Sequence, residues 1–279
     1  MNKFTQMGLS AALAFGVMAP ASAFQTFSIN AQSDGFAGID ATALEYLDFI
    51  GNSFVVNTFA GAPSIGAPFT FVDDGIFKVT GVDGSPQFSF GGSELTTIFH
   101  GAGTGTLGGS ISFTSGTLSV YADSAQDYAS ANGIYGANNG TLIGTFDLTF
   151  GSGLINNDAT PNGLITLEFA ATSLAAGTWF DLSGNDLSLN PQNFAFVTSN
   201  ASLLQTASAT LTSELVCQGA GFNCPNGTPF SNTPLNFLVS NNGQYRTDTA
   251  QVPVPGSLAL LGIGLFALGF RSKSYKNHK

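Results

Sequence analysis

The segment Thr145-Phe-Asp-Leu-Thr-Phe150 alternates polar and apolar residues with a period of two. Successive side chains of a β-strand point to opposite faces, so Phe146, Leu148 and Phe150 should share the buried face of one strand. The three polar residues should then face solvent. The segment therefore predicts a half-buried strand.

Similar segments recur through the middle of the chain, separated by Gly, Asn, Asp and Ser, which are common turn residues. The predicted strands are Phe24 to Ala31, Phe54 to Phe59, Phe77 to Val82, Leu95 to His100, Ser110 to Tyr121, Thr141 to Phe150, Leu164 to Ala170, Phe194 to Thr198 and Leu235 to Ser240. Within them, Ile111 to Tyr121 should form a hairpin that turns at Ser115-Gly116. Many short strands between turns predict an all-β fold, and we expect an antiparallel β-sandwich of jelly-roll type.

One stretch, Asp40 to Ile50, has helical character. Asp40 can cap a helix, and Leu44, Leu47 and Phe49 follow at roughly helical spacing. Because no linker or fixed repeat divides the middle of the chain, we expect one ectodomain over residues 24–243. The polar residues 244–251 should form a flexible stalk.

The charge of the middle region excludes one class of partner. All 17 acidic residues lie there, but of the 7 basic residues only Lys78 and Arg246 do. An acidic surface repels nucleic acid, so we expect no nucleic-acid partner. The 26 phenylalanines supply apolar area for a core.

The first residues predict export. Lys3 precedes an apolar run, and Ala21-Ser-Ala23 fits a cleavage site for a secretory signal peptide over residues 1–23. Cleavage after Ala23 makes Phe24 the first residue of the mature chain. An uncleaved membrane helix is the alternative interpretation.

A three-part tail occupies residues 252–279. Its first part reads Val252, Pro253, Val254, Pro255, Gly256 and Ser257. An apolar run from Leu258 to Phe270 follows, which is shorter than the ~20 residues of a membrane-spanning helix, and Arg271 opens a basic end. The tail predicts a sorting helix that holds the chain in the membrane for a time, with an ordinary C-terminal anchor as the alternative.

These two ends resemble those of PEP-CTERM exported bacterial proteins, although Val254 stands where that signature has Glu. The resemblance implies export across the inner membrane, processing by an exosortase-type enzyme at the Val252 to Ser257 motif, and a transient membrane-anchored form. It also implies an extracellular or cell-surface location and an association with exopolysaccharide, biofilm or floc formation. The start at Phe24 and the segment Asp123 to Asp127 are similar to the flocculation-associated members of this class.

Two cysteines, Cys217 and Cys224, flank a glycine-rich turn. In an exported chain this spacing favours a disulfide that closes a short loop. A metal site is the alternative, but no histidine lies nearby to complete a zinc site.

Catalytic motifs are weak. Gly103-Thr-Gly-Thr-Leu-Gly108 has the spacing of a dinucleotide-binding loop, but a strand pattern follows it, so we expect a turn between strands. His100 could join Asp73, Asp123 or Ser93 in a catalytic triad, but no Gly-x-Ser-x-Gly motif occurs. We expect a surface or strand-end histidine instead.

Acidic residues leave three further possibilities open. A glycosidase pair could be drawn from Glu45, Glu94, Glu168, Glu214 and several Asp residues, although exposed strand carboxylates are the simpler interpretation. Calcium could bind at Asp73-Asp-Gly75, Asp83-Gly-Ser85 or Asp181 to Asp186, but none matches the EF-hand pattern. Sugar-binding candidates are Trp179-Phe-Asp181, Tyr121-Ala-Asp123, and Tyr128 and Tyr135 near Asn138-Asn139.

Together these patterns predict an exported, non-enzymatic protein of the extracellular matrix or cell surface, with no resident cofactor beyond a possible Ca²⁺. Exopolysaccharide or other matrix components are the expected partners. A carbohydrate-binding module is the main alternative, and a secreted hydrolase is the other.

Overall fold

The alternating segment at residues 145–150 lies in β8 (Thr141–Asn156), a long antiparallel strand. The computed structural model describes residues 26–32, 38–86, 90–156, 162–189, 196–222 and 230–247. All of them belong to one compact unit, Ala23–Asp248. As predicted, Phe146 is buried and Leu148 partly buried, but Phe150 is 51 % exposed. A β-bulge between Leu148 and Phe150 shifts the register against β9 (Asn162–Leu174) and turns Phe150 outward.

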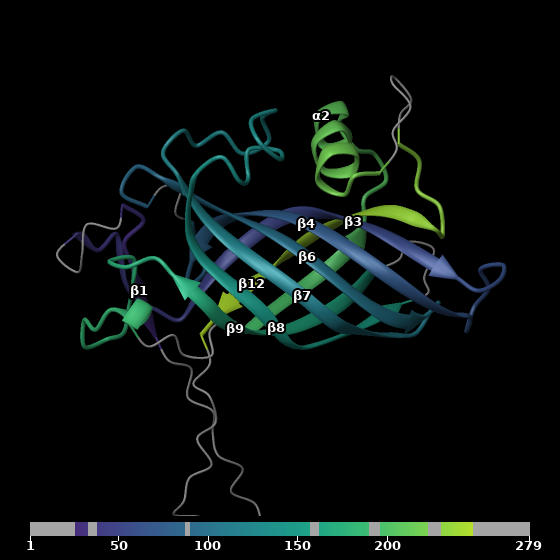
Figure 1. Ribbon diagram of the computed structural model, residues 1–279, viewed down its shortest axis with the longest axis horizontal. Helices are drawn as coiled ribbons and strands as arrows, with labels where there is room; N and C mark the ends of the chain where they lie inside the picture. The colour runs from purple at the N-terminus through teal and green to yellow at the C-terminus, as the bar shows by residue number, and fades with distance from the viewer. Residues whose placement is uncertain are drawn as a thin grey trace, which may run out of the picture. The chain divides into compact units, whose positions relative to one another are not determined.

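Eight strands follow one another in chain order round a closed barrel, each antiparallel to the next (Figure 1). They are β3 (Tyr46–Phe59), β4 (Pro68–Val82), β6 (Glu94–Thr106), β7 (Ser110–Asp123), β8, β9, β11 (Phe196–Leu203) and β12 (Asn236–Arg246). The last strand closes the barrel on the first, with Asn236 opposite Val56 and Arg246 opposite Tyr46. A two-residue strand, β5 (Ser85–Pro86), pairs with the end of β4.

The expected sandwich is therefore wrong, because the fold is a closed barrel. The alternation of residues predicts the buried face of each strand but does not say whether the outermost strands meet. Closure pairs the edges that a sandwich leaves open. It depends on contacts between distant residues such as Ser53 and Asn241, which are 188 positions apart and hydrogen-bonded through their side chains.

Phenylalanine rings and glycines face each other inside the barrel. The ring of Phe71 lies over Gly103 of the neighbouring strand, and the ring of Phe99 lies over Gly101 and Gly116. A Cβ atom at any of these glycines would crowd the ring. This alternation of large and small residues lets many rings fit within eight strands. It gives a structural reason for a chain that combines 26 phenylalanines with 35 glycines.

A small three-stranded sheet lies at one end of the barrel (Figure 1). Its strands are β10 (Trp179–Phe180), β1 (Phe27–Ile29) and β2 (Ala41–Leu44), and the 3₁₀ helix η2 (Leu187–Leu189) follows β10. The Trp179 indole donates a hydrogen bond of 2.8 Å to the Ile143 carbonyl and packs edge-on against Phe146. The sheet therefore joins the barrel core at this end.

The helix expected from Asp40 to Ile50 is wrong, since these residues form β2 and the start of β3. Leu47 and Phe49 are buried, whereas Ile50 is 50 % exposed, so the burial repeats every two residues. Ala43 also adopts a φ of 55°, which interrupts any right-handed helix.

The sequence patterns missed the helical segment that covers part of the outer barrel wall. It consists of α2 (Ala209–Leu211) and the π-helix η3 (Thr212–Gly219), and Ser208 caps it by accepting a 3.0 Å hydrogen bond from the Leu211 amide. A second hydrophobic core fills the space between this segment and the wall. Its buried members are Phe54, Ile76, Ala137, Leu211, Leu215, Val216 and Leu238.

Two local predictions are also wrong. Ser115-Gly116 is no hairpin turn, because β7 runs through it and the chain only bulges against β6 between Ala102 and Gly103. The predicted stalk begins too early, because β12 continues to Arg246. No helix among the described residues is both long and apolar enough to cross a bilayer. The predicted signal peptide and the C-terminal sorting helix lie outside those residues.

Candidate functional site

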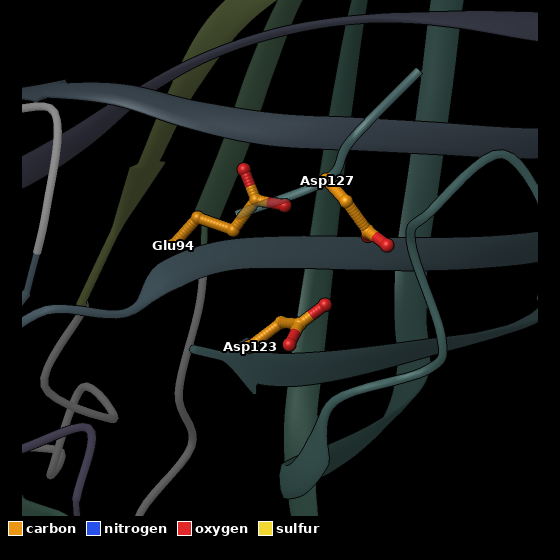
Figure 2. Close-up of side chains that lie close together, drawn as sticks. All are labelled: Glu94, Asp123 and Asp127. Atoms are coloured by element: carbon orange, nitrogen blue, oxygen red, sulfur yellow. The ribbon is translucent and has the colours of Figure 1, made fainter. Parts of the chain in front are cut away.

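A long connection between β7 and β8, residues 124–140, crosses the outer face of the barrel. Three carboxylates lie where it begins, with oxygen atoms within 4.8 Å of one another (Figure 2). Glu94 opens β6 and Asp123, directly opposite, ends β7, while Asp127 belongs to the connection itself. This acidic cluster fixes the path of the connection.

Of the three carboxylates, Glu94 accepts hydrogen bonds at both of its oxygens. Its Oε2 accepts a 2.6 Å hydrogen bond from the Lys78 ammonium, and its Oε1 accepts one of 2.8 Å from the Tyr128 amide. The Glu94 side chain is fully buried, whereas that of Lys78 is 28 % exposed. The ion pair therefore neutralises a buried charge and ties the connection to two barrel strands.

The two aspartates hold the connection by shaping its turns. Asp123 Oδ1 accepts the Ala125 amide at 2.8 Å, while its buried Oδ2 has no hydrogen-bond partner among the described residues. Asp127 accepts hydrogen bonds from the Asn132 and Asn139 side chains, which lower the pKa of its carboxyl. All three carboxylates thus accept hydrogen bonds from other groups of the protein, and the cluster serves as an anchor for the connection.

The anchored connection places two tyrosines against the outer wall. The rings of Tyr128 and Tyr135 pack edge to face, with centroids 5.4 Å apart. The Tyr128 hydroxyl donates a hydrogen bond of 3.2 Å to the Ile76 carbonyl, and burial raises the pKa of this phenol. Both rings also contact the second hydrophobic core, which fixes their orientation.

Beside these rings, polar side chains form a patch across three strands. The outward residues of β11, β12 and β3 align in two rows: Asn200, Asn242 and Ile50 in one, and Ser202, Ser240 and Asn52 in the other. With Tyr128 and Tyr135 they line a groove of about 440 Å³, which we call the outer groove. It presents amide and hydroxyl groups next to aromatic rings, and none of its lining residues is charged.

Comparison with known proteins identifies one end of the chain. Residues 251–274 match the family model of the PEP-CTERM protein-sorting motif. This chain carries a PEP-CTERM sorting tail. The motif marks an exported protein that an exosortase sorts to the cell surface or the extracellular space. No curated protein matches the sequence. No solved structure matches it.

The PEP-CTERM match includes all six residues of the predicted processing motif, from Val252 to Ser257. These residues, like the predicted cleavage-site residues Ala21 and Ala23, lie outside the described residues. So does Cys224, while Cys217 lies in η3, where its Sγ is 3.2 Å from the Thr212 carbonyl oxygen. The cut sites and the pairing of the two cysteines stay predictions.

The residues of the possible triad do not come together. His100 is exposed on the outer wall, where its Nδ1 lies 2.6 Å from Asp74 Oδ1. Asp73, one position earlier, is buried and lines the barrel interior. Ser93 and Asp123 lie at the opposite end of β6 and β7 from the turn that joins these strands. The expectation of a surface histidine is confirmed.

The predicted glycine loop is wrong in most of its length. Gly103 and Gly105 belong to β6, and only Leu107 to Gly109 form the turn. Among the acids, Glu168 and Asp147 are exposed on strands as expected, whereas Glu94 and Glu214 are buried.

The carboxylates of two predicted calcium loops accept hydrogen bonds from the protein itself, and the third segment lies in a strand. Asp73-Asp-Gly75 is part of β4, not a loop. Asp83 Oδ1 accepts the Glu45 and Tyr46 amides, both at 2.9 Å. Asp181 accepts from Ser183 and Asn185, and the Asn185 side chain lowers the pKa of this carboxyl. Asp181 therefore acts as a turn-forming residue, whereas Asp83 ties the end of β4 to the start of β3.

Of the predicted sugar-binding aromatics, Trp179 and Phe180 are core residues, at 2 % and 3 % exposure. Tyr128 and Tyr135 do line a groove. The polar residues beside them were missed because they come from three strands distant in sequence. The available signal was the polar residues at neighbouring outward positions of one strand, such as Asn200 and Ser202, but only the register shows which residues of the other strands lie beside them.

Proposed function

We propose that this exported chain is a non-enzymatic protein of the cell surface or extracellular matrix that holds a neutral polysaccharide in the outer groove. The observation that carries the proposal is the alignment of amide and hydroxyl side chains beside Tyr128 and Tyr135. The proposal combines the predicted matrix protein with its main alternative, the carbohydrate-binding module, because a matrix protein with this groove would act by binding carbohydrate.

The chemistry of the groove suits sugar rings. Asn52, Asn200 and Asn242 each offer an amide that can both donate and accept a hydrogen bond, as neighbouring sugar hydroxyls require. An aromatic ring gives the apolar face of a sugar a flat surface to pack against. Because the side chains sit on paired strands of a closed barrel, the groove is preorganised for binding.

Charge favours a neutral polymer. The groove lining is uncharged, and the chain as a whole has a formal net charge of −10. An anionic polysaccharide would be repelled by this field, most strongly at low ionic strength. We therefore assign the matrix role to a neutral exopolysaccharide in biofilm or floc.

The proposal assigns no turnover to the chain. Its support is the separation of the candidate catalytic groups: His100 faces solvent with Asp74, and Asp73 faces the barrel interior. The secreted-hydrolase alternative needs an acid pair across a cleft. Loss of a measured activity on a Glu→Gln substitution would support that alternative.

Affinity electrophoresis tests the groove. The protein should be retarded in gels that contain a neutral glucan, such as dextran, and not in gels that contain alginate. The double variant Asn200→Ala/Asn242→Ala should weaken the retardation about tenfold, because each lost hydrogen bond contributes about 0.5–1.5 kcal/mol.

A matched control is Thr104→Ala/Ser112→Ala, which removes an outward pair of polar residues on β6 and β7, away from the groove. This control should migrate like the unmodified protein. Equal mobility of both variants in dextran gels would contradict the proposal.

The tail completes this proposal. The Leu258 to Phe270 run would hold the newly exported chain in the membrane until exosortase cuts near Val252 to Ser257. Its support is the PEP-CTERM match, which spans both segments. The processed barrel would then be free to join the matrix.

A further inference from the structure

The barrel interior holds a cavity that the outer groove does not use. Its volume is about 440 Å³, within the range of small-molecule binding sites. Its walls are mostly apolar and come from seven of the eight barrel strands, all but β8. The larger apolar side chains among them are Val55, Phe69, Phe71, Leu107, Ile111, Phe113, Ile165, Leu203, Phe237 and Val239.

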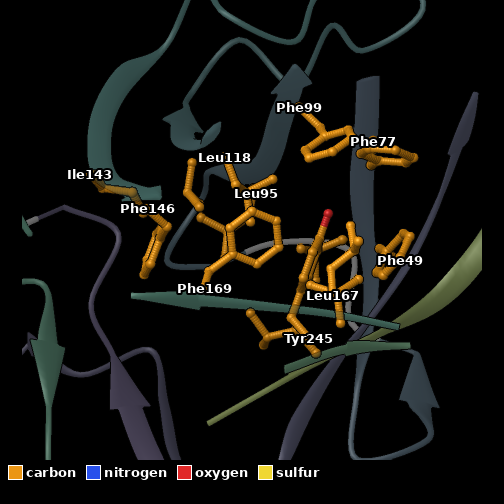
Figure 3. Close-up of a cluster of buried hydrophobic side chains, with 14 of the residues drawn as sticks. Phe49, Phe77, Leu95, Phe99, Leu118, Ile143, Phe146, Leu167, Phe169 and Tyr245 are labelled. Atoms are coloured by element: carbon orange, nitrogen blue, oxygen red, sulfur yellow. The ribbon is translucent and has the colours of Figure 1, made fainter. Parts of the chain in front are cut away.

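Most of the empty space in the described interior lies in one half, since the cavities in the other half hold only about 20–30 Å³ each. In the other half, toward the small sheet, aromatic and aliphatic side chains from several strands pack against one another, among them Phe49, Phe77 and Tyr245 (Figure 3). The cavity lies at the opposite end, near the turn at Leu107-Gly108 and the segment Asn232 to Pro234. The barrel interior is thus hollow at the end near Leu107-Gly108 and packed with side chains at the end near the small sheet.

Two buried acceptors without partners line this cavity. Asp73 is 7 % exposed and Asn57 is 6 % exposed. Neither Asp73 Oδ1 nor Asn57 Oδ1 has a hydrogen-bond partner among the described residues. Leaving a buried polar atom unpaired costs about 1–3 kcal/mol, and more for a charged group. A ligand that donates a hydrogen bond to either atom would therefore be favoured in this cavity.

The groups around Asp73 do not supply that donor. A hydrogen bond from Ser53 reaches the Asp73 carboxyl, but burial has the larger effect and raises the pKa of Asp73 to about 7. The Ser53 hydroxyl in turn accepts the Asn241 amide at 3.1 Å, and Asn57 Nδ2 donates to the Pro234 carbonyl at 3.1 Å. Asp73 Oδ1 and Asn57 Oδ1 can therefore each still accept a hydrogen bond.

We propose that the barrel cavity binds a small apolar molecule with one hydrogen-bond-donating head group, whose head lies at Asp73. The apolar body would fill the space between Phe71, Phe113 and Phe237, and removal of that surface from water would supply most of the affinity. A primary amine suits the head best, because its N–H groups can donate to the Asp73 carboxyl and no Lys or Arg is among the residues that line the cavity. This site is separate from the outer groove and does not depend on polysaccharide binding.

Two fluorescent probes of nearly the same shape test the proposal on the full chain. 1-Aminoanthracene carries an apolar body and an amine, and anthracene lacks the amine. At pH 8, where Asp73 is ionised because its pKa is about 7, both should bind with increased fluorescence. 1-Aminoanthracene should then bind about tenfold more tightly, which is the effect of one hydrogen bond to a charged group.

Three variants locate the site. Asp73→Asn should remove most of the difference between the two probes while anthracene affinity stays unchanged. Leu203→Trp, in the cavity wall, should abolish binding of both probes. Leu189→Trp is the matched control, because it adds the same indole at an exposed position of η2, and it should bind like the unmodified protein.

Circular dichroism confirms that each variant is folded. Failure of both probes to bind, or binding that Leu203→Trp leaves intact, would overturn the cavity as a ligand site. Equal affinities for the two probes, unchanged by Asp73→Asn, would overturn the role of Asp73. Neither result would affect the dextran experiment, which tests a different surface.

Discussion

Asp73 and Asp74 are consecutive residues of β4 that lie on opposite sides of the barrel wall. Asp73 is buried in the interior with one oxygen unpaired, while Asp74 pairs with His100 on the outer surface. Because strand neighbours alternate in direction, one residue step separates a carboxyl inside the barrel from one that pairs with a histidine on the outer wall.

The burial of Asp73 predicts how stability depends on pH. Its pKa rises from an ordinary 3.8 to about 7, because burial and the neighbouring Asp74 outweigh the opposing effects of Ser53 and His100. Between these values the unfolded chain has lost a proton that the folded chain keeps. The folded state therefore loses stability as pH rises from about 4 to about 7, by at most about 1.4 kcal/mol per pH unit.

Urea unfolding of the unmodified protein and of Asp73→Asn, at several values from pH 4 to pH 8, measures this effect. The Asn variant lacks the titrating group, so it should gain stability relative to the unmodified protein as pH rises, and the difference should level off above pH 7. Parallel stability curves would show that Asp73 ionises normally.

The contact of Phe71 with Gly103 predicts a packing effect. A Cβ at residue 103 would lie 2.5 Å from the Phe71 ring and would also collide with the Ser112 carbonyl oxygen. Gly103→Ala should therefore cost at least about 1–3 kcal/mol of unfolding free energy, as overpacked cores do. Gly61→Ala is the control, because nothing lies within 4 Å of its added Cβ, and it should change stability little. A neutral Gly103→Ala would contradict the close packing of rings on glycines.

The ion pair of Lys78 with Glu94 predicts a double-mutant result. Lys78→Met leaves a fully buried carboxylate without its cation and should cost about 3–5 kcal/mol. Adding Glu94→Gln removes that charge and should recover part of the loss. Additive effects of the two substitutions in chemical denaturation would mean that the pair does not stabilise the fold.

Intact-mass spectrometry of the protein from culture supernatant and from membranes of the host tests the processing of both ends. A secreted species should begin at Phe24 and end between Val252 and Ser257, and any added mass would identify an attached group. A membrane species that still ends at Lys279 would argue instead for a simple anchor.

Local patterns in the sequence predicted much of the strand content but not the way the strands assemble. The alternation at Phe146 and Leu148 reports which face is buried, and the structure confirms it. Barrel closure depends on the pairing of β12 with β3, which no local pattern encodes. The false helix at Asp40 to Ile50 arose because a short apolar run fits both periods, and φ at Ala43 decides between them.

The outer groove was predictable only in the part that depends on residues close together in the sequence. Tyr128 and Tyr135 are close in sequence and could be recognised as a pair near Asn138 and Asn139. Asn52, Asn200 and Asn242 come together only through strand register, so their common groove required the structure. Asp73 appeared to be a calcium-loop residue until its strand placed it inside the barrel.

The most direct test of the account is a nuclear magnetic resonance titration of the ¹⁵N-labelled protein with a neutral glucan oligosaccharide. We predict that the side-chain amide signals of Asn52, Asn200 and Asn242 shift together with saturation, while those of residues elsewhere on the barrel stay in place. Absence of shifts at saturating oligosaccharide, or shifts confined to another face, would contradict the assignment of the outer groove as the polysaccharide site.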